Sequence, residues 1–248
     1  MNLRTACPSC HLRHNQYFTT NIPYQGKKSY IITCPNGHSY RFTIFNHHFD
    51  LMFYSACNAM LDHYFGEAIV AATGALETFR KFYLEIIFMS KKLNIEIRES
   101  LFKEIRLSER LYGAFQIIYY LNEKELPLKN STKIPGSSME LINMRNKVSH
   151  EGYYPTPEET HEFCRIVYEE INKVLDILVT KYNDSLDEKH QLDIEIDTSG
   201  IEDSDGHFPS KSVTLQTPFF ISYYSMQSLS SFDEEIEKLR IERMRSDL

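Results

Sequence analysis

Apolar residues recur at helical spacing throughout the middle of the chain, from residue 48 to residue 183. The stretches 52–60, 68–87, 111–121 and 156–182 place apolar side chains three or four residues apart, with almost no strand-like alternation. Small residues at the start of the second stretch allow close packing, and the large aromatic residues that follow fill space. The pattern predicts an up-and-down bundle of about four or five helices, so the fold class is mainly α.

The last of these helices has the clearest start. Thr156 is a good N-cap residue and Pro157 fits the first turn. Glu158 and Glu159 follow, and acidic side chains are favourable at the positive end of the helix dipole. We therefore expect a long helix that begins at this point and closes the bundle.

The first 47 residues have a different pattern, in which β-rich segments alternate with two short cysteine turns. The first turn reads C-P-S-C and the second reads C-P-N-G-H. The segments 30–33 and 40–45 are rich in strand formers. The order turn, strand, turn, strand predicts a small β zinc ribbon as a first domain, residues 1–47.

The two turns supply four ligands for one tetrahedral ion: Cys7, Cys10, Cys34 and His38. Thiolate and imidazole ligands in a closed set suit a structural Zn²⁺ ion, one per chain. His11 and His14 compete for the fourth position, but His38 is favoured because it belongs to the second turn. A module of about 45 residues buries too little apolar surface to be stable alone, so the metal would supply much of its folding free energy.

Charge is unevenly distributed along the 248 residues. The whole chain has a net charge of −7, but residues 1–50 hold five basic side chains and one acidic, a balance of +4. Residues 184–206 hold nine acidic side chains and one lysine, a balance of −8, which leaves the rest of the chain at +1. The net charge therefore does not exclude a nucleic-acid partner.

The acidic stretch opens the last segment, residues 184–248, which we interpret as a linker followed by an α/β appendage. Its composition favours a loop, and the strict alternation in residues 192–197 predicts an edge strand there. Residues 212–225 are rich in strand formers, and residues 232–244 predict a charged amphipathic helix. The sequence leaves open whether this appendage packs on the bundle or on a partner.

The chain has the features expected of a cytoplasmic protein without a membrane partner. No apolar run approaches the roughly 18 residues that a membrane span needs. Arg4 and Cys7 stand where a secretory signal would have an apolar core. The paired cysteines therefore point to metal binding rather than to disulfides.

A short segment before the last helix carries the candidate chemistry. The sequence S-S-M-E at residues 137–140 fits a capping box and predicts a short helix. This helix leads into R-N-K-V-S-H at residues 145–150. Arg145 and His150 lie about 140° apart on a continuous helix, so they converge only if the helix ends between them. We expect Gly152 to supply that end.

The motif R-N-x-x-x-H, followed by a turn and a long helix, resembles the R-x4-6-H motif of HEPN domains. These are small α-helical modules of many bacterial toxins, abortive-infection proteins and CRISPR-associated ribonucleases. The resemblance covers residues 48–183, and Asn146 matches the polar residue that usually follows the arginine. It implies a HEPN-like helical bundle for this second domain.

The resemblance also implies an activity, metal-independent endoribonuclease chemistry at a composite site shared by a homodimer. Arg145 would bind the scissile phosphate, and Asn146 would orient the phosphate or the imidazole. His150 would act as general acid or base, because imidazole titrates near neutral pH. Transesterification by the RNA 2′-OH would leave a 2′,3′-cyclic phosphate. The family further implies antiviral defence or growth arrest, with the zinc ribbon recognising nucleic acid or a phage trigger.

Glu77 is the candidate third partner in the catalytic site. It lies in the middle of an apolar stretch, where a buried carboxylate would need a cation, and Arg145 is the nearest candidate by this reasoning. An exposed Glu77 that pairs with Lys81, four residues further on, is the alternative.

A non-enzymatic function is the competing hypothesis. Arg145 and His150 are also suited to stabilise the C-terminal end of a helix and to pair with Glu140 or Glu151. The chain would then be a zinc-binding adaptor whose helical domain only dimerises and recruits partners.

Under the nuclease hypothesis, the acidic residues 184–206 have a second role, to lie against Arg145 and mimic RNA. The activation signal and the RNA target are not specified by the sequence.

Overall fold

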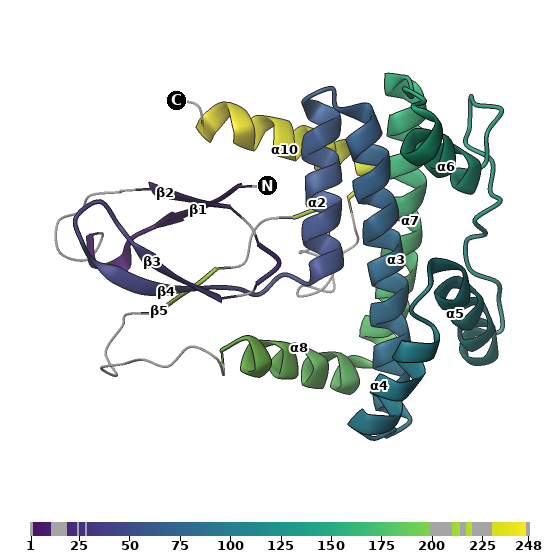
Figure 1. Ribbon diagram of the computed structural model, residues 1–248, viewed down its shortest axis with the longest axis horizontal. Coiled ribbons are helices and arrows are strands. Elements are labelled where there is room, and N and C mark those ends of the chain that lie inside the picture. The colour runs from purple at the N-terminus through teal and green to yellow at the C-terminus, as the bar shows by residue number, and fades with distance from the viewer. Residues whose placement is uncertain are drawn as a thin grey trace. The chain divides into compact units, whose positions relative to one another are not determined.

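The computed structural model describes residues 2–10, 19–23, 25–27, 29–198, 210–213, 217–219 and 230–246, and it is mainly helical (Figure 1). The chain divides into two compact units. The first, the ribbon unit, comprises Met1–His47 and Asp187–Gln216, and the second, the helical unit, comprises His48–Leu186 and Thr217–Leu248. The C-terminal segment, residues 184–248, is thus divided between the two units.

The ribbon unit contains two small sheets. Strands β1 (Asn2–Ala6) and β2 (Thr19–Pro23) form an antiparallel pair. Strand β3 (Ser29–Thr33) pairs antiparallel with β4 (Ser39–Ile44), which confirms the two strands expected around the second cysteine turn. Strand β5 (Ser210–Val213) adds to β4 in parallel. Along β4 the alternating side chains of Tyr40, Phe42 and Ile44 are fully buried, because a strand turns every second residue to the same face.

The expectation of an edge strand at residues 192–197 is wrong. These residues belong to helix α8 (Asn183–Thr198), whose second half lies in the ribbon unit. An ion pair of 2.5 Å joins Lys189 to Asp193 one helical turn later, and Asp193 also lies 3.5 Å from His47 Nδ1. Six alternating residues are a weak signal, and the local helical pair together with the long-range contact to His47 outweighs it. The remaining acidic residues, 199–206, lie outside the described residues.

The helical unit confirms the helices that periodicity predicts and adds one that it does not. Its helices are α2 (His48–Leu61), α3 (Phe65–Ser90), α4 (Ile95–Glu104), α5 (Ser108–Glu123), α6 (Leu141–Glu151), α7 (Pro157–Lys181) and α10 (Phe232–Ser246). Helix α4 escaped the sequence analysis because none of its residues is buried, although Asn94 is an N-cap that accepts a hydrogen bond from the Ile97 N–H. Helices α2 and α3 lie side by side (Figure 1). Helix α3 is also packed against α5, α6 and α7.

Aromatic rings fill the centre of the helical unit. The rings of Phe49 and Phe79 lie 5.0 Å apart, which joins α2 to α3. Phe219 lies 4.9 Å from the ring of Phe53 and 5.4 Å from that of Tyr168, so a residue near the C-terminus completes the core between α2 and α7. Such pairs add specific geometry to the apolar burial that stabilises the bundle.

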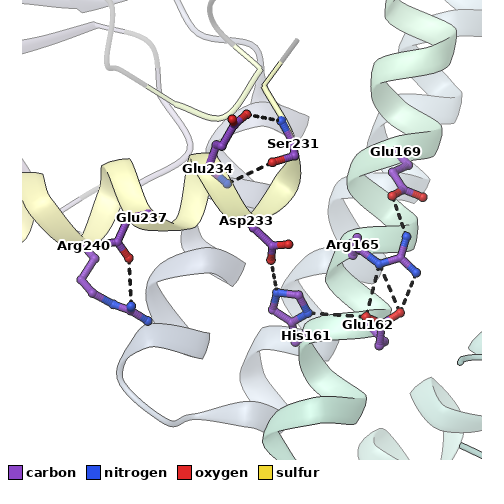
Figure 2. A network of polar contacts seen from close by, with 9 residues as sticks. All are labelled: His161, Glu162, Arg165, Glu169, Ser231, Asp233, Glu234, Glu237 and Arg240. Atoms are coloured by element: carbon purple, nitrogen blue, oxygen red, sulfur yellow. Dashed lines mark hydrogen bonds and ion pairs between the residues drawn. The ribbon is translucent and has the colours of Figure 1, made fainter. Parts of the chain in front are cut away.

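Helix α10 packs on α2 and α7 of the bundle. Figure 2 shows His161 of α7 directed at Asp233 of α10, with 2.7 Å between Nε2 and Oδ1. The helix begins with a capping box, because the Ser231 N–H donates to Glu234 and the Glu234 N–H donates to Ser231 (Figure 2). Phe232, Ile236 and Leu239 are buried. The amphipathic helix predicted at residues 232–244 is confirmed.

Among the described residues, no helix combines the length and apolar character that crossing a bilayer requires.

Candidate metal centre and motif site

Four side chains of the ribbon unit form a compact cluster: Cys7, Cys10, Cys34 and His38. The Sγ atoms of Cys10 and Cys34 are 3.8 Å apart, and His38 Nδ1 lies 3.3 Å from Cys10 Sγ and 3.7 Å from Cys34 Sγ. A tetrahedron with metal–sulfur bonds of about 2.3 Å has edges of about 3.8 Å. The cluster therefore has the dimensions of a site that could hold a metal ion.

Local structure explains why the ligands from the second turn face inward. Strands β3 and β4 form a hairpin whose loop is the turn itself, closed by hydrogen bonds from the Cys34 N–H to His38 O and from the Gly37 N–H to Cys34 O. Gly37 has a φ of +79°, a conformation that glycine adopts without strain. The Asn36 side chain lies 3.5 Å from Cys10 Sγ and thereby links the two turns. The competing histidines, His11 and His14, lie outside the described residues.

The cysteines of the cluster differ in their electrostatic surroundings. Burial raises the pKa of the Cys10 thiol. Burial also opposes ionisation of Cys34, but hydrogen bonds from the backbone of His38 and Asn36 outweigh it and lower the pKa of Cys34. Backbone N–H groups that point at a sulfur stabilise a thiolate, which is the form that binds metal.

The candidate motif lies on helix α6, whose start differs from the expectation. The expected end at Gly152 is confirmed, but it lies beyond both Arg145 and His150. The helix does not begin with a capping box at residues 137–140; it begins after Glu140, because an extended pairing of Lys133 with Glu140 holds the preceding residues. It also does not end between Arg145 and His150. It runs through both residues to Glu151, and Gly152, with φ of +68°, forms the C-cap.

The continuous helix still connects the three motif residues. Arg145 Nη1 donates a 3.0 Å hydrogen bond to Asn146 Oδ1, so Asn146 holds the guanidinium. Asn146 and His150 are four residues apart and therefore lie on one face of the helix. His150 is exposed, whereas Leu141 and Met144 on another face are buried. Arg145, Asn146 and His150 thus follow one another across the surface of α6.

Glu77 and Arg145 line the same small cleft between α3 and α6. Glu77 accepts a hydrogen bond from the Ser108 hydroxyl of α5. Lys81, the alternative partner, places its Nζ 5.3 Å from the centre of the Phe102 ring. Within the described part of the chain, Glu77 has no ion pair with either cation. The cleft brings Glu77 and Arg145 together, and His150 lies outside its lining.

The sequence analysis did not identify the role of Glu159 beyond its place near the helix dipole. Its carboxylate accepts 2.7 Å hydrogen bonds from the hydroxyls of Ser137 and Tyr153 and a 3.1 Å bond from the Thr156 N–H. Glu159 thereby ties the segments before and after α6 to the start of α7. The pattern T-x-x-E at residues 156–159 is the signal that predicts this capping box.

Comparisons of the chain with protein-family models, with curated proteins and with solved structures find no match.

Proposed function

We propose that the chain is a metal-independent endoribonuclease of the HEPN type, which acts as a homodimer in bacterial antiviral defence or growth arrest. The observation that supports the proposal is the surface of α6. There the guanidinium of Arg145 is held by Asn146, one helical turn from the exposed His150. A cation for the phosphate and an imidazole for proton transfer are the two groups that this reaction needs.

In the proposed reaction, the ribose 2′-OH attacks the adjacent phosphorus and the bond from phosphorus to the 5′-oxygen breaks. A base takes the proton of the 2′-OH, and an acid returns a proton to the leaving 5′-oxygen. The products are a 2′,3′-cyclic phosphate and a 5′-OH. The motif supplies one His150 per protomer, so a dimer supplies the two imidazoles that act as base and acid. Arg145 stabilises the negative charge that develops on the phosphate.

The ribbon unit supports this function through its metal centre, which we propose to be a structural Zn²⁺ site. Three thiolates and one imidazole form a complete tetrahedral set, which leaves no position for a substrate. Its task is to hold the ribbon in shape for recognition of nucleic acid or of a phage-derived trigger.

The test is an RNA cleavage assay in the presence of EDTA, with metal content and circular dichroism measured in the same samples. We expect the wild type to cleave, and Arg145→Ala and His150→Ala each to lose about 10²-fold or more in rate, the usual contribution of a general acid or base. Ser149→Ala is the matched control, since Ser149 is an exposed neighbour on the same helix. Full activity of His150→Ala would refute the assigned site.

The same assay separates the nuclease from the zinc-binding adaptor. A folded, dimeric wild type that leaves RNA intact is the result that the adaptor hypothesis requires. Light scattering establishes the dimer, because the chain mass of 29.2 kDa would double.

The acidic stretch gives a separate test of regulation. If residues 184–206 mimic RNA at Arg145, then neutralising Glu202, Asp203 and Asp205 by E202Q, D203N and D205N should raise RNA cleavage. These substitutions leave the residues of α8 unchanged. Unchanged cleavage by the triple variant would rule out a role for these three acids.

A further inference from the structure

The cleft that holds Arg145 also contains a second arginine, which the proposed mechanism does not use. The cleft has a volume of about 30 Å³. Its walls come from α3, α6, α7 and the segment before α6, and they include Glu77, Arg80, Asn130 and Arg145. A space of this size admits about one water-sized atom.

Arg80 is unusual because it is a buried cation without a counterion. Arg80 lies within the apolar stripe of α3, and only 3% of the residue is exposed. Among the described residues, its Nε and Nη2 atoms have no hydrogen-bond partner, and no carboxylate lies within ion-pair distance. Burial lowers the pKa of Arg80 to about 10, so the group still carries its charge at neutral pH. A buried charge without a partner is costly, so an anion that bound to Arg80 would offset part of this cost.

Aromatic residues hold the Arg80 guanidinium in place. Its carbon lies 4.6 Å from the centre of the Tyr112 ring and 5.7 Å from that of Phe115, both on α5. The Tyr112 hydroxyl in turn accepts hydrogen bonds of 3.0 Å from the Asn130 N–H and 2.7 Å from Gln116 Nε2. The face of the guanidinium is thus occupied, while its buried Nε and Nη2 atoms, which lie in the plane of the group, have no hydrogen-bond acceptor among the described residues.

The nearest acids are engaged with other groups. Glu77 is bound to Ser108, and Glu170 accepts a 2.9 Å hydrogen bond from the Leu128 N–H. Burial also raises the pKa of Glu170, which weakens it as a counterion. Two guanidiniums, Arg80 and Arg145, therefore border one narrow cleft.

We infer that this cleft binds one phosphate group of the RNA backbone, which inserts a non-bridging oxygen between Arg80 and Arg145. Guanidinium groups donate charge-assisted hydrogen bonds to phosphate oxygens in a fixed planar geometry. Arg80 is then a phosphate-binding residue of the site, and its preorganised stack on Tyr112 spares the ordering cost on binding. This inference rests on the proposed ribonuclease function for the identity of the phosphate donor.

The first experiment measures phosphate binding without RNA. Thermal unfolding is followed with increasing inorganic phosphate at constant ionic strength. We expect phosphate to raise the Tm of the wild type and of Arg106→Met, which removes an exposed arginine. The rise should be absent in Arg80→Met and partly restored in Arg80→Lys. Equal rises in wild type and Arg80→Met would overturn the inference.

Arg80→Met is designed to stay folded. Replacing a buried charge by an apolar side chain of similar length is commonly neutral or stabilising, so its Tm without phosphate should equal or exceed that of the wild type. If Arg80→Met nevertheless unfolds, Arg80→Lys serves as the test of the guanidinium, because it keeps the charge but loses the planar group. A Lys variant that responds to phosphate as strongly as the wild type would then contradict a role for the guanidinium.

The second experiment measures affinity for a 2′-O-methyl RNA oligonucleotide, which lacks the attacking hydroxyl. We expect Arg80→Met to bind about tenfold more weakly or worse, the effect of a lost charge-assisted hydrogen bond. We also expect the slope of log affinity against log salt to fall by about 0.7, the value for one phosphate contact on a single strand. An unchanged slope would mean that Arg80 does not contact a phosphate and has only a structural role.

The two proposals fail separately. Phosphate and oligonucleotide binding that depend on Arg80, in a protein that does not cleave RNA, would support the phosphate cleft and refute the nuclease. Cleavage that depends on His150, with phosphate binding unaffected in Arg80→Met, would support the nuclease and refute the phosphate cleft.

Discussion

The two units of this protein are stabilised by different means. In the ribbon unit, four ligands from two turns meet in one cluster, and the described strands are short. In the helical unit, long helices enclose a continuous core in which many aromatic side chains are fully buried. Apolar burial stabilises the bundle, whereas the described part of the ribbon has few buried apolar side chains and a four-residue cluster that could hold a metal ion. We therefore expect the stability of the ribbon, and not that of the bundle, to depend on metal.

The same contrast separates the chemistry of the two units. The candidate metal ligands are enclosed, since Cys7, Cys10 and Cys34 are buried and His38 is half-buried. The motif of α6 presents an exposed imidazole, and its Arg145 lines a small cleft that also contains Arg80. We therefore propose a structural role for the enclosed cluster and a substrate-binding role for the surface of α6.

Loss of a candidate metal ligand should have the largest effect, and it should destabilise the ribbon unit alone. We expect Cys34→Ser to cost the ribbon unit about 10 kcal/mol, the scale of structural zinc binding. Hydrogen exchange should show β3 and β4 losing protection while α3 and α7 keep theirs. Cys164→Ala is the control, because this cysteine is buried in the helical core and should leave the metal content unchanged. Full protection of β3 and β4 in metal-free protein would contradict the link.

A cavity in the helical core should have the opposite effect. Phe79 is fully buried against Phe49, so Phe79→Ala should destabilise the helical unit by about 3–5 kcal/mol. Urea unfolding followed by circular dichroism measures this loss, and metal content should stay at the wild-type value. Val70→Ala, at a half-exposed position of the same helix, should change stability by less than about 0.5 kcal/mol. Loss of metal in Phe79→Ala while the helices remain folded would show that the units depend on each other.

The capping box of α7 tests a smaller, local contribution within the helical unit. Thr156 accepts a 3.2 Å hydrogen bond from the Glu159 N–H, so Thr156→Ala should cost about 1 kcal/mol. Thr156→Ser keeps the hydroxyl and should remain close to the wild type in urea unfolding. A Ser variant as unstable as the Ala variant would argue against the cap as the cause.

The pH dependence of the same box should be the smallest effect. Burial opposes ionisation of Glu159, but hydrogen bonds from Ser137, the Thr156 N–H and Tyr153 outweigh it, so its pKa lies below the usual 4.5. A lowered pKa in the folded state stabilises above pH 4.5, and this stabilisation is lost as the pH falls through the folded-state pKa.

The difference in Tm between wild type and Glu159→Gln should therefore shrink as the pH is lowered below 4.5. Glu158→Gln, an exposed neighbour, is the control and should show a much flatter difference. A Glu159→Gln difference that is constant from neutral to acidic pH would exclude this carboxylate as the titrating group.

Local chemistry made the metal cluster and several helices predictable. The ligands of each turn are close in sequence, and the spacing of C-P-S-C and C-P-N-G-H leaves few ways to arrange them. The long helix α7 was marked by its cap and its apolar period, and α10 by its period. These signals depend on residues within one or two turns of each other, so they can be recognised from the sequence alone.

Long-range contacts explain the errors. Residues 192–197 alternate like a strand, but the pairing of Asp193 with His47 spans most of the chain. The expected box at residues 137–140 does not form, because Glu140 pairs with Lys133 in an extended bridge and Ser137 bonds to Glu159 on another helix. A local pattern cannot reveal a partner that is brought near only by folding.

Neighbouring residues encode the Cys3His cluster that could hold a metal ion, the mainly helical class and the R-N-x-x-x-H motif, so all three could be predicted from the sequence. Only the tertiary structure decided that α6 is continuous through Arg145 and His150, that Glu77 binds Ser108, and that Arg80 is buried on Tyr112. The physical reason is that burial and the pairing of charges depend on which helices pack together. In an apolar stripe, a sequence pattern gives no distinction between an arginine that reaches solvent and one that packing encloses.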